Sequence, residues 1–567
     1  MPKISALLAL SLLSAGAVAQ NSLSFDASQG VEQFMDFYDG STVRYTAYEH
    51  LYYVTNVEDS TYQYLNVYVP EGATQQTPIL MRTYVGGYMA SAATQPKVGD
   101  ATGRALWEGY VVVIPGSRGR NSSVTATAQQ VKALKKVKGD KRFKSIKEGD
   151  TLFNGRAPQG ILDLKAAVRY LRQVDKEMPG DAERIITDGT SAGGAMSALL
   201  GATGNNPEYE AMLDAMGAAK QRDDVYASVC YCPIIDLEHA DMAYEWMYGP
   251  TDSRRALDST QQALSMQLGM QFNHYLDSLQ LVKPDSMPLN GGTLIEYIKS
   301  ELIASAQMAK NAGAEIPDTI GMEFSSDNAP QRFRRDRMMI KERPAKLTRE
   351  DEPQMLMRKM TPEERAQRKE ASRPKNMELE MKMIANPHKI RGGAQNAASG
   401  MPGPMMMRRN QGEYITELDM RTYVNYVASC QPLKGVPAFD SMIQDVNEAS
   451  GENELFGSIL GEPANFTDFS AAANGTSVSD TTRRNVRLMN PMSFLGDDQT
   501  TVAQHWYIRH GSRDRDTAFP IPLIFATRLR NTGHDVDFLY AWNRYHSGDY
   551  NLDDLFSWIA EVLANGE

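Results

Sequence analysis

The sequence is poor in features that mark several large classes of protein. Cysteine occurs only three times in 567 residues, too few for a fold held together by disulfides. No apolar run after the first 19 residues approaches the roughly 18 residues that a transmembrane helix needs, so we expect no membrane span. The net charge is −11, which argues against a nucleic-acid partner. The composition therefore predicts a large, water-soluble globular protein.

The N-terminal residues have the pattern of an export signal. The first three carry a positive charge, the stretch from Ile4 to Leu13 is apolar, and Ala17-Val18-Ala19 is a small-residue cleavage site. We expect residues 1–19 to be a signal peptide cleaved before Gln20, which places the mature protein in the periplasm or outside a bacterial cell. A polar, mobile lead to about Ser41 is expected to follow.

The three cysteines are interpreted as small buried hydrophobic residues. They are Cys230, Cys232 and Cys430. A disulfide from Cys430 to one of the other two is the alternative, because export permits such bonds.

The chain is organised around Gly189–Gly193, a Gly-x-Ser-x-Gly motif centred on Ser191. A β-branched run precedes it and an Ala-, Leu- and Met-rich segment ending near Gly201 follows, which is the strand, sharp turn and helix of a nucleophile elbow. Glycines flank the serine because a Cβ there would collide with the neighbouring strand and helix. Ser191 is therefore the predicted nucleophile, and the backbone N–H of Ala192 is the first predicted oxyanion-hole donor.

The segments before this motif predict the start of a sheet. Tyr48–Val54 and Tyr62–Val69 alternate aromatic or β-branched residues with polar ones and are typical of antiparallel edge strands. The next strand, Ile79–Tyr84, leads to Gly86 and Gly87, and paired glycines let a backbone approach a substrate carbonyl closely. One N–H of this pair is the second predicted oxyanion-hole donor, with an ordinary glycine turn as the alternative.

Further apolar runs predict a mostly parallel sheet. Tyr110–Ile114 is continuously apolar, as a strand buried on both faces should be, and Gln159–Val174 has helical spacing. Val225–Asp236 indicates the next strand, and the last two strands are expected at His505–Gly511 and Asp535–Ala541.

A long segment without a predicted core strand separates two of these strands and indicates the domain organisation. Between Asp236 and His505 lie 268 residues, far more than a loop. We predict an α/β-hydrolase fold with a large cap or lid domain inserted between the sixth and seventh core strands. The core is then formed by residues 20–236 and 505–567, and the cap by residues 237–504, over the carboxyl ends of the strands.

Within the cap, residues 331–410 differ from the rest of the chain. They hold 20 Lys and Arg against 10 Asp and Glu, and 12 of the 31 methionines. We expect a flexible insert without chemistry, with a surface for polyanionic or polyphenolic substrates as the alternative.

Two further residues complete a catalytic triad in the expected order. Asp514 follows the penultimate strand, and His546 follows the last strand 32 residues later. A serine hydroxyl becomes a nucleophile when an imidazole takes its proton, and a carboxylate fixes the imidazole tautomer. Asp516 and Asp236 are the rival candidates for the acid.

Several motifs together resemble those of the bacterial tannases (tannin acyl hydrolases). They are Gly189–Ala195, Cys232–Trp246, the loop Asp514–Thr517 and His546–Tyr550. The resemblance covers most of the chain except the signal peptide and about 331–410. It implies an α/β-hydrolase whose triad serine, acid and histidine are the residues already named.

The resemblance also implies residues that bind a galloyl group. The lysine of the family corresponds to Lys434, its glutamate to Glu452 and its second aspartate to Asp516. Glu448 and Glu454 are alternatives for the glutamate. Two carboxylates and an ammonium can together bond the three adjacent hydroxyls of a pyrogallol ring, and a site built for those hydroxyls should reject analogues that lack them.

The chain departs from the fungal tannase and feruloyl esterase group. That group places cysteines beside the catalytic serine and histidine, where this chain has Thr190 and Tyr545. The calcium site of that group is not expected, and we predict no metal and no other cofactor.

These inferences predict an exported serine esterase that forms an acyl-enzyme with small aromatic galloyl esters and hydrolysable tannins and releases gallic acid. A feruloyl or broad aryl carboxylesterase with the same triad is the first alternative. The second is an inactive α/β-hydrolase fold that binds polyphenols or a partner protein. Labelling of Ser191 by a fluorophosphonate separates that last alternative from the two enzymes.

Overall fold

The computed structural model describes residues 23–137, 141–325, 414–442 and 448–565. The expected signal peptide and the basic segment 331–410 lie outside the described residues. The chain divides into two compact units, the first made of residues 1–33, 44–324 and 415–567 and the second of residues 34–43 and 325–414. All of the candidate site residues belong to the first unit.

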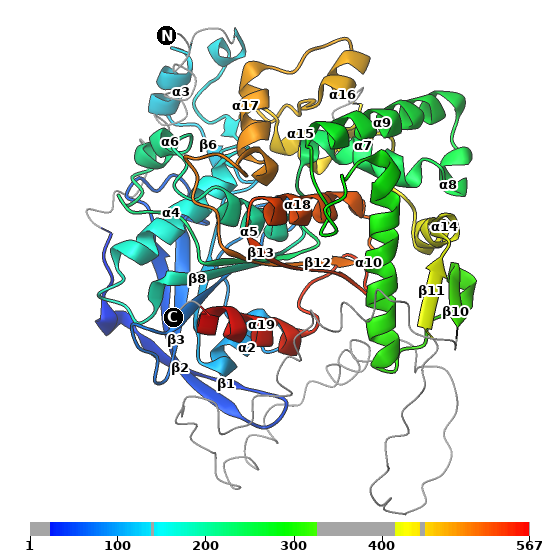
Figure 1. The fold of residues 1–567 in the computed structure, drawn as a ribbon. Coiled ribbons are helices and arrows are strands. Elements are labelled where there is room, and N and C mark those ends of the chain that lie inside the picture. The colour runs from blue at the N-terminus through cyan, green and yellow to red at the C-terminus, as the bar shows by residue number, and fades with distance from the viewer. Residues whose placement is uncertain (1–22, 138–140, 326–413, 443–447, 566–567) are drawn as a thin grey trace, which may run out of the picture. The chain divides into compact units, whose positions relative to one another are not determined.

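A nine-stranded sheet forms the centre of the fold, and Figure 1 shows helices against it. The strand order is β1-β2-β3-β5-β4-β8-β9-β12-β13. β3 runs antiparallel to β2 and to β5, and the strands from β5 to β13 are parallel. The bounds are β1 (Val31–Asp36), β2 (Thr42–Tyr52), β3 (Tyr64–Pro70), β4 (Pro78–Thr83), β5 (Val111–Pro115), β8 (Asp181–Thr190), β9 (Ala227–Tyr231), β12 (His505–Gly511) and β13 (Asp535–Ala541). Two-stranded pairs are formed by β6 (Val124–Thr125) with β7 (Thr151–Leu152) and by β10 (Met322–Ser325) with β11 (Tyr414–Leu418).

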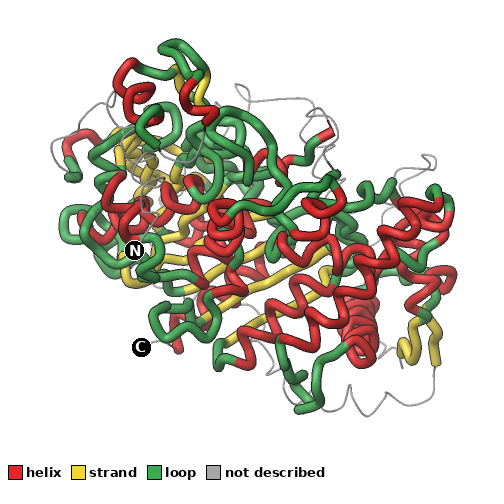
Figure 2. Tube along the Cα trace, turned by 90° about the horizontal axis from the view of Figure 1, so that it is seen from above, coloured by secondary structure: helices red, strands yellow, loops and turns green. Residues whose placement is uncertain are grey.

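Helices cover both faces of the sheet. On one face α2 (Ala101–Glu108) contacts α19 (Leu552–Asn565), and on the other lie α4 (Gln159–Gln173), α5 (Ala192–Ala202) and α18 (Pro520–Asn531) (Figure 1). Seen from above, red helices overlie the yellow strands (Figure 2). The strand order with these two helical layers is the α/β-hydrolase fold, so the predicted fold class is confirmed. In the described parts of the chain the other α-helices are α3 (Ala128–Leu134), α6 (Glu210–Ala215), α7 (Leu237–Tyr248), α8 (Asp252–Arg255), α9 (Ser259–Ser278), α10 (Gly291–Asn311), α14 (Met420–Cys430), α15 (Gly451–Leu455), α16 (Asp468–Ala473) and α17 (Asp480–Leu488).

The central strands are apolar because both of their faces are covered. All five residues of β5 are buried, as are all five of β9. α5 packs against β8 and β9, and all eleven residues of α5 are buried. The strand carrying the nucleophile motif and the helix that follows it are thus held rigidly in the core.

The described part of residues 237–504 is mostly helical. α7 packs along α9, and α10 contacts β13 and α18. The boundaries of the predicted cap, 237–504, and of the two core segments stay a prediction. None of the helices in the described parts of the chain has the length and apolar character needed to cross a bilayer.

The structure differs from the sequence-based expectation at three places. The two strands expected at the edge of the sheet are β2 and β3, which lie inside it because β1 forms the edge. The strand expected at Val225–Asp236 ends at Tyr231, because Cys232 has a φ of 45° and leaves the extended conformation. The lead expected to be irregular contains β1, a strand at Val31–Asp36. All three cysteines carry free thiols. Cys230 and Cys232 are buried, as the first interpretation of the cysteines requires, whereas Cys430 is only partly buried.

Candidate active site

Ser191 stands on a sharp turn between β8 and α5. Its backbone has φ 63° and ψ −124°, a conformation that costs free energy for a residue with a Cβ and is typical of a nucleophile held by its surroundings. A Cβ added at Gly189 would lie 2.2 Å from the carbonyl oxygen of Gly193, and one added at Gly193 would lie 2.8 Å from that of Thr83. The flanking glycines are therefore required by crowding, as the sequence motif predicts.

A continuous chain of hydrogen bonds joins the serine to the predicted histidine and acid. Nε2 of His546 lies 2.7 Å from Oγ of Ser191, and Nδ1 of His546 lies 2.8 Å from Oδ2 of Asp514. The other carboxylate oxygen of Asp514 accepts the backbone N–H of Asp516 at 2.8 Å. Asp514 is 1% exposed, whereas the side chain of His546 keeps 19% of its surface accessible. The arrangement leaves Nε2 able to accept the serine proton while Nδ1–H is held by the carboxylate.

The ionisation of these groups suits proton transfer. Burial alone would raise the pKa of Asp514, but His510, His546 and the hydrogen bonds to the carboxylate outweigh it and lower that pKa to about 2. Burial alone would lower the pKa of His546, but the charge and hydrogen bond of Asp514 outweigh it and raise that pKa above its usual value of 6.5. Asp514 is thus ionised at neutral pH, and His546 is a stronger base than a free imidazole.

The rival acids occupy other places. Oδ2 of Asp516 lies 3.9 Å from Nδ1 of His546, beyond hydrogen-bond distance, and the other oxygen of Asp516 pairs with Arg515. Asp236 lies at the start of α7 and bonds His239, Tyr275 and Asn490. Of the three candidate acids, Asp514 alone hydrogen-bonds the imidazole of His546.

The predicted oxyanion-hole residues lie at the ends of β4 and β8. Ala192 is the first residue of α5, where backbone N–H groups have no partner within the helix. A side chain added at Gly86 or Gly87 would meet no atom within 4 Å, so the space in front of these glycines is open. Gly87 has a φ of 54°, and the following residue, Tyr88, fixes the loop through a 2.6 Å hydrogen bond from its hydroxyl to the carbonyl of Ile234.

Two of the predicted galloyl-binding residues lie near the histidine. Asp516 follows the triad acid, and the positive charge of Lys434 acts against protonation of His546, which places Lys434 within electrostatic reach. The ammonium of Lys434 lies 3.9 Å from the ring centre of Phe439, and its backbone N–H donates to the hydroxyl of Tyr244 at 3.2 Å.

Glu452 lies in the first turn of α15, and its charge adds to burial in raising the pKa of Tyr88, the residue after the predicted oxyanion-hole glycines. The alternative Glu454 is paired with Arg120. Glu448 is exposed, just after the undescribed stretch 443–447. Arg120 also donates from Nε–H to the carbonyl of Gly87 at 2.8 Å, so the structure connects both Glu452 and Glu454 to the oxyanion-hole loop, and the choice between them stays a prediction.

Two buried clusters support the site and escaped the sequence analysis. Arg82 bonds both Asp188 and Asp549, so that one guanidinium joins β4, the elbow strand and the loop after His546. Asp440 is fully buried and accepts hydrogen bonds from five groups, the side chains of Asn453, Asn465 and Thr467 and the backbone N–H groups of Phe466 and Thr467. Arginine and aspartate at these positions carry no local sequence signal, because their partners are distant along the chain.

Two groups of side chains near the triad have the composition of metal ligands. Asp514, Asp516 and His546 form one group, and Cys232, His510 and Asp514 form the other, with the ligand atoms of each group within 4.8 Å of one another. The expectation that the protein needs no metal stays a prediction.

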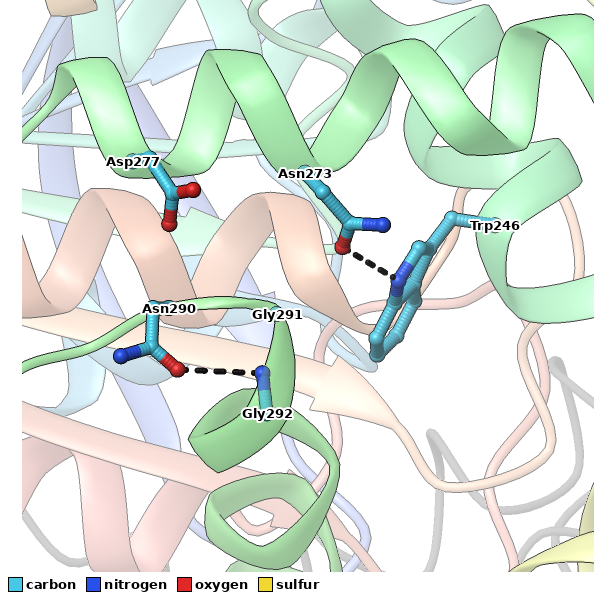
Figure 3. A pocket seen from close by; sticks show the side chains of 6 residues that line it. All are labelled: Trp246, Asn273, Asp277, Asn290, Gly291 and Gly292. Atoms are coloured by element: carbon cyan, nitrogen blue, oxygen red, sulfur yellow. Dashed lines mark hydrogen bonds between the residues drawn. The ribbon is translucent and has the colours of Figure 1, made fainter.

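A separate cavity of about 440 Å³ lies beside α7, α9 and the start of α10. Figure 3 shows Trp246 donating from its indole N–H to Asn273, at 3.2 Å, and Asn290 capping α10. Asp277 and two glycines complete the lining, and none of the predicted site residues takes part.

One family profile and one curated protein are similar to parts of this chain in sequence. The BD-FAE family profile matches residues 152–287, the part of the chain that contains the nucleophile motif. The esterase LipC of Mycobacterium tuberculosis is 45% identical over 58 residues, which span 10% of this chain and 14% of that protein. The chain thus spans about a seventh of the length of this curated relative.

Solved structures match nearly the whole chain. The tannin acyl hydrolase from Lactobacillus plantarum is 31% identical, with a TM-score of 0.69 over 95% of this chain and 98% of that one. A tannin acyl hydrolase in complex with ethyl gallate is 32% identical, with a TM-score of 0.68 over the same shares of the two chains.

Proposed function

Because the chain belongs to the tannin acyl hydrolase (tannase) family of carboxylic ester hydrolases, we propose that it hydrolyses the galloyl esters of small gallates and hydrolysable tannins. The observation that carries the proposal is the hydrogen-bonded chain Ser191–His546–Asp514, with spacings of 2.7 and 2.8 Å. The same geometry argues against an inactive binding fold, since a serine without a function in catalysis does not need an oriented imidazole.

The proposed reaction has two halves. His546 takes the proton of Ser191 as the hydroxyl oxygen attacks the galloyl carbonyl, and it returns that proton to the departing alcohol. Water then attacks the galloyl-enzyme with His546 again as the base, releasing gallic acid and restoring Ser191. Asp514 stays ionised and stabilises the imidazolium formed in each half.

The oxyanion of each tetrahedral intermediate is proposed to bind the N–H of Ala192 and one N–H from Gly86 or Gly87. The free N–H groups at the start of α5 and the open space at the two glycines support this assignment. Removing one such donor typically costs about 3 kcal/mol of transition-state stabilisation.

Recognition of the pyrogallol ring is proposed for Lys434, Glu452 and Asp516, contributed largely by the predicted cap, residues 237–504. Support comes from Asp516, whose Oδ2 lies 3.9 Å from Nδ1 of His546, and from Lys434, whose charge acts on His546. The similar tannin acyl hydrolase in complex with ethyl gallate, a small galloyl ester, supports it as well. Three adjacent hydroxyls could then be bonded by two carboxylates and one ammonium.

The deciding experiment compares kcat/KM on methyl gallate with that on methyl ferulate. The proposal expects a strong preference for gallate, and a reduced preference in Lys434→Met. Lys283→Met, whose ammonium pairs with Asp285 away from the triad, serves as the matched control. A preference for ferulate would favour the feruloyl or broad aryl esterase. That outcome would leave the triad intact.

Export to the periplasm or the medium is proposed from residues 1–19. N-terminal sequencing of the protein recovered outside the cytoplasm should begin at Gln20. Recovery of full-length protein from the cytoplasm alone would refute export.

A further inference from the structure

The triad acid belongs to a second group of reactive side chains, which is buried. Cys232 follows β9, His510 belongs to β12, and Asp514 follows β12. Their sulfur, nitrogen and oxygen atoms all lie within 4.8 Å of one another, and the three residues are no more than 1% exposed. The proposed reaction uses only Asp514 of the three.

The lack of hydrogen bonds to the ring of His510 is unusual for a buried polar side chain. Among the described residues, neither ring nitrogen of His510 finds a hydrogen-bond partner, although Nδ1 lies 3.5 Å from Oδ2 of Asp514. The rings of Phe519 and Tyr540 pack edge-on against it. Leaving a buried polar group unpaired costs about 1 to 3 kcal/mol, so a group that bonds His510 would recover that cost.

The contacts of His510 and Cys232 are compatible with metal binding. His510 offers two ring nitrogens that no hydrogen bond occupies, and imidazole is a common metal ligand. The thiol of Cys232 donates to the carbonyl oxygen of Ser547 at 3.4 Å. A divalent cation could replace the thiol proton and balance the charges of the thiolate and Asp514.

We infer that Cys232, His510 and Asp514 form a binding site for a soft divalent cation such as Zn²⁺ or Cd²⁺, and that its occupancy inhibits the esterase. One sulfur, one imidazole nitrogen and one carboxylate oxygen make a ligand set that these ions favour. The inhibition rests on the proposed function, whereas the binding does not.

Binding is a proton-releasing exchange. The thiol of Cys232 loses its proton to solvent as sulfur bonds the metal, His510 donates a nitrogen lone pair, and Oδ2 of Asp514 becomes the third ligand. That oxygen is the one that accepts from Nδ1 of His546. The imidazole therefore loses its orienting partner, and the proton transfer from Ser191 becomes inefficient.

The competing location is the outer group of Asp514, Asp516 and His546, which contains no sulfur. A spectroscopic titration separates the two. Adding Cd²⁺ to the metal-free full-length protein should produce a thiolate-to-cadmium charge-transfer band that saturates at one ion per chain. The band should vanish in Cys232→Ser and persist in Cys430→Ser and Asp516→Asn. A band that survives in Cys232→Ser, or its absence from the wild type, would overturn the site.

Inhibition of ester hydrolysis by the metal provides a second test of the site. Zn²⁺ should inhibit ester hydrolysis, and chelation should restore it. The inhibition constant should rise by roughly 100-fold in Cys232→Ser and in His510→Asn, because losing a ligand should cost at least as much as losing a residue that merely supports one. Equal inhibition of both folded variants and the wild type would refute the inference. If no ester is hydrolysed at all, the proposed function fails, but the cadmium band still decides the site.

Discussion

Arg82 and Asp549 form a two-point ion pair across 467 positions of the chain, with Nη1–Oδ1 at 3.0 Å and Nη2–Oδ2 at 2.7 Å. The same guanidinium bonds Asp188, three residues before the nucleophile. Arg82 is the last residue but one of β4, which leads to the oxyanion-hole loop, and Asp549 follows His546 by three positions. A single buried side chain thus connects the segments that carry the oxyanion-hole glycines, Ser191 and His546.

Replacing Arg82 with methionine should both destabilise the protein and slow the reaction. Arg82→Met keeps the aliphatic length but leaves Asp188 buried and unpaired, which should cost about 3 to 5 kcal/mol in the free energy of unfolding. Urea unfolding measures this. Arg255→Met is the control, because Arg255 and its partner Asp252 are both exposed and the change should cost less than about 1 kcal/mol. Equal stability of the two variants would contradict the assignment.

Asp549→Asn tests positioning separately from stability. Arg82 keeps its pair with Asp188 in this variant, so the fold should survive while the loop after His546 loosens. We expect kcat on methyl gallate and the rate of fluorophosphonate labelling of Ser191 to fall together by roughly tenfold, with KM nearly unchanged. A change in KM alone would show that Asp549 supports substrate binding and leaves the histidine in place.

The nucleophile turn was predictable because its constraints are local. Gly189→Ala would bring a Cβ to 2.2 Å from the carbonyl oxygen of Gly193 and 2.6 Å from the hydroxyl of Thr83. The turn should shift, and we expect loss of most activity with a lower melting temperature. Gly99→Ala, where a Cβ would meet nothing within 4 Å, is the control and should behave as wild type. Full activity of Gly189→Ala would remove the steric argument.

The fold and the serine–histidine–aspartate set could be predicted, because strand periodicity, the elbow motif and the order of three residues are all written along the chain. β12 and β13 occur where the apolar runs place them. β1 was missed because its apolar residues, at positions 31, 34 and 35, do not alternate with polar ones along the sequence.

The supporting clusters could not be predicted for a different reason. Arg82 in a β-strand has the same local pattern whether it faces solvent or two carboxylates. His510 lies within a strand that the sequence predicts, and only the three-dimensional structure brings it beside Asp514. Contacts between residues that are distant in sequence depend on how the strands are ordered in the sheet, which periodicity does not specify.

The buried carboxyl of Asp241 should make stability depend on pH. Burial, and then the charge of Asp440, raise its pKa to about 7 in the folded protein, against about 3.9 in an unfolded chain. The folded state therefore holds an extra proton between these values, and its stabilising effect is present below pH 4 and lost as pH rises through 7. The loss is on the order of 4 kcal/mol.

Asp241→Asn removes this titration. The variant can be less stable at every pH, because an amide accepts only one of the two backbone N–H bonds, from Phe439 and Asp440, that the carboxylate accepts. Its free energy of unfolding, measured in urea from pH 4.5 to 8, should nevertheless fall less steeply with pH than that of the wild type. Parallel curves for the two proteins would exclude Asp241 as the source.

Asp440 should govern substrate binding through the segment that carries Glu452. Its carboxylate accepts from Asn453, the residue after Glu452, and from groups at positions 465–467. Asp440→Asn turns one acceptor oxygen into a donor and leaves buried N–H groups unpaired, at about 1 to 3 kcal/mol each. Because Asp440 makes no hydrogen bond to the triad, we expect KM for methyl gallate to rise by roughly tenfold while kcat changes less. Asp468→Asn, at an exposed carboxylate paired with Arg483, is the control. A lower kcat with an unchanged KM would mean that Asp440 acts on the triad and not on the ring-binding segment.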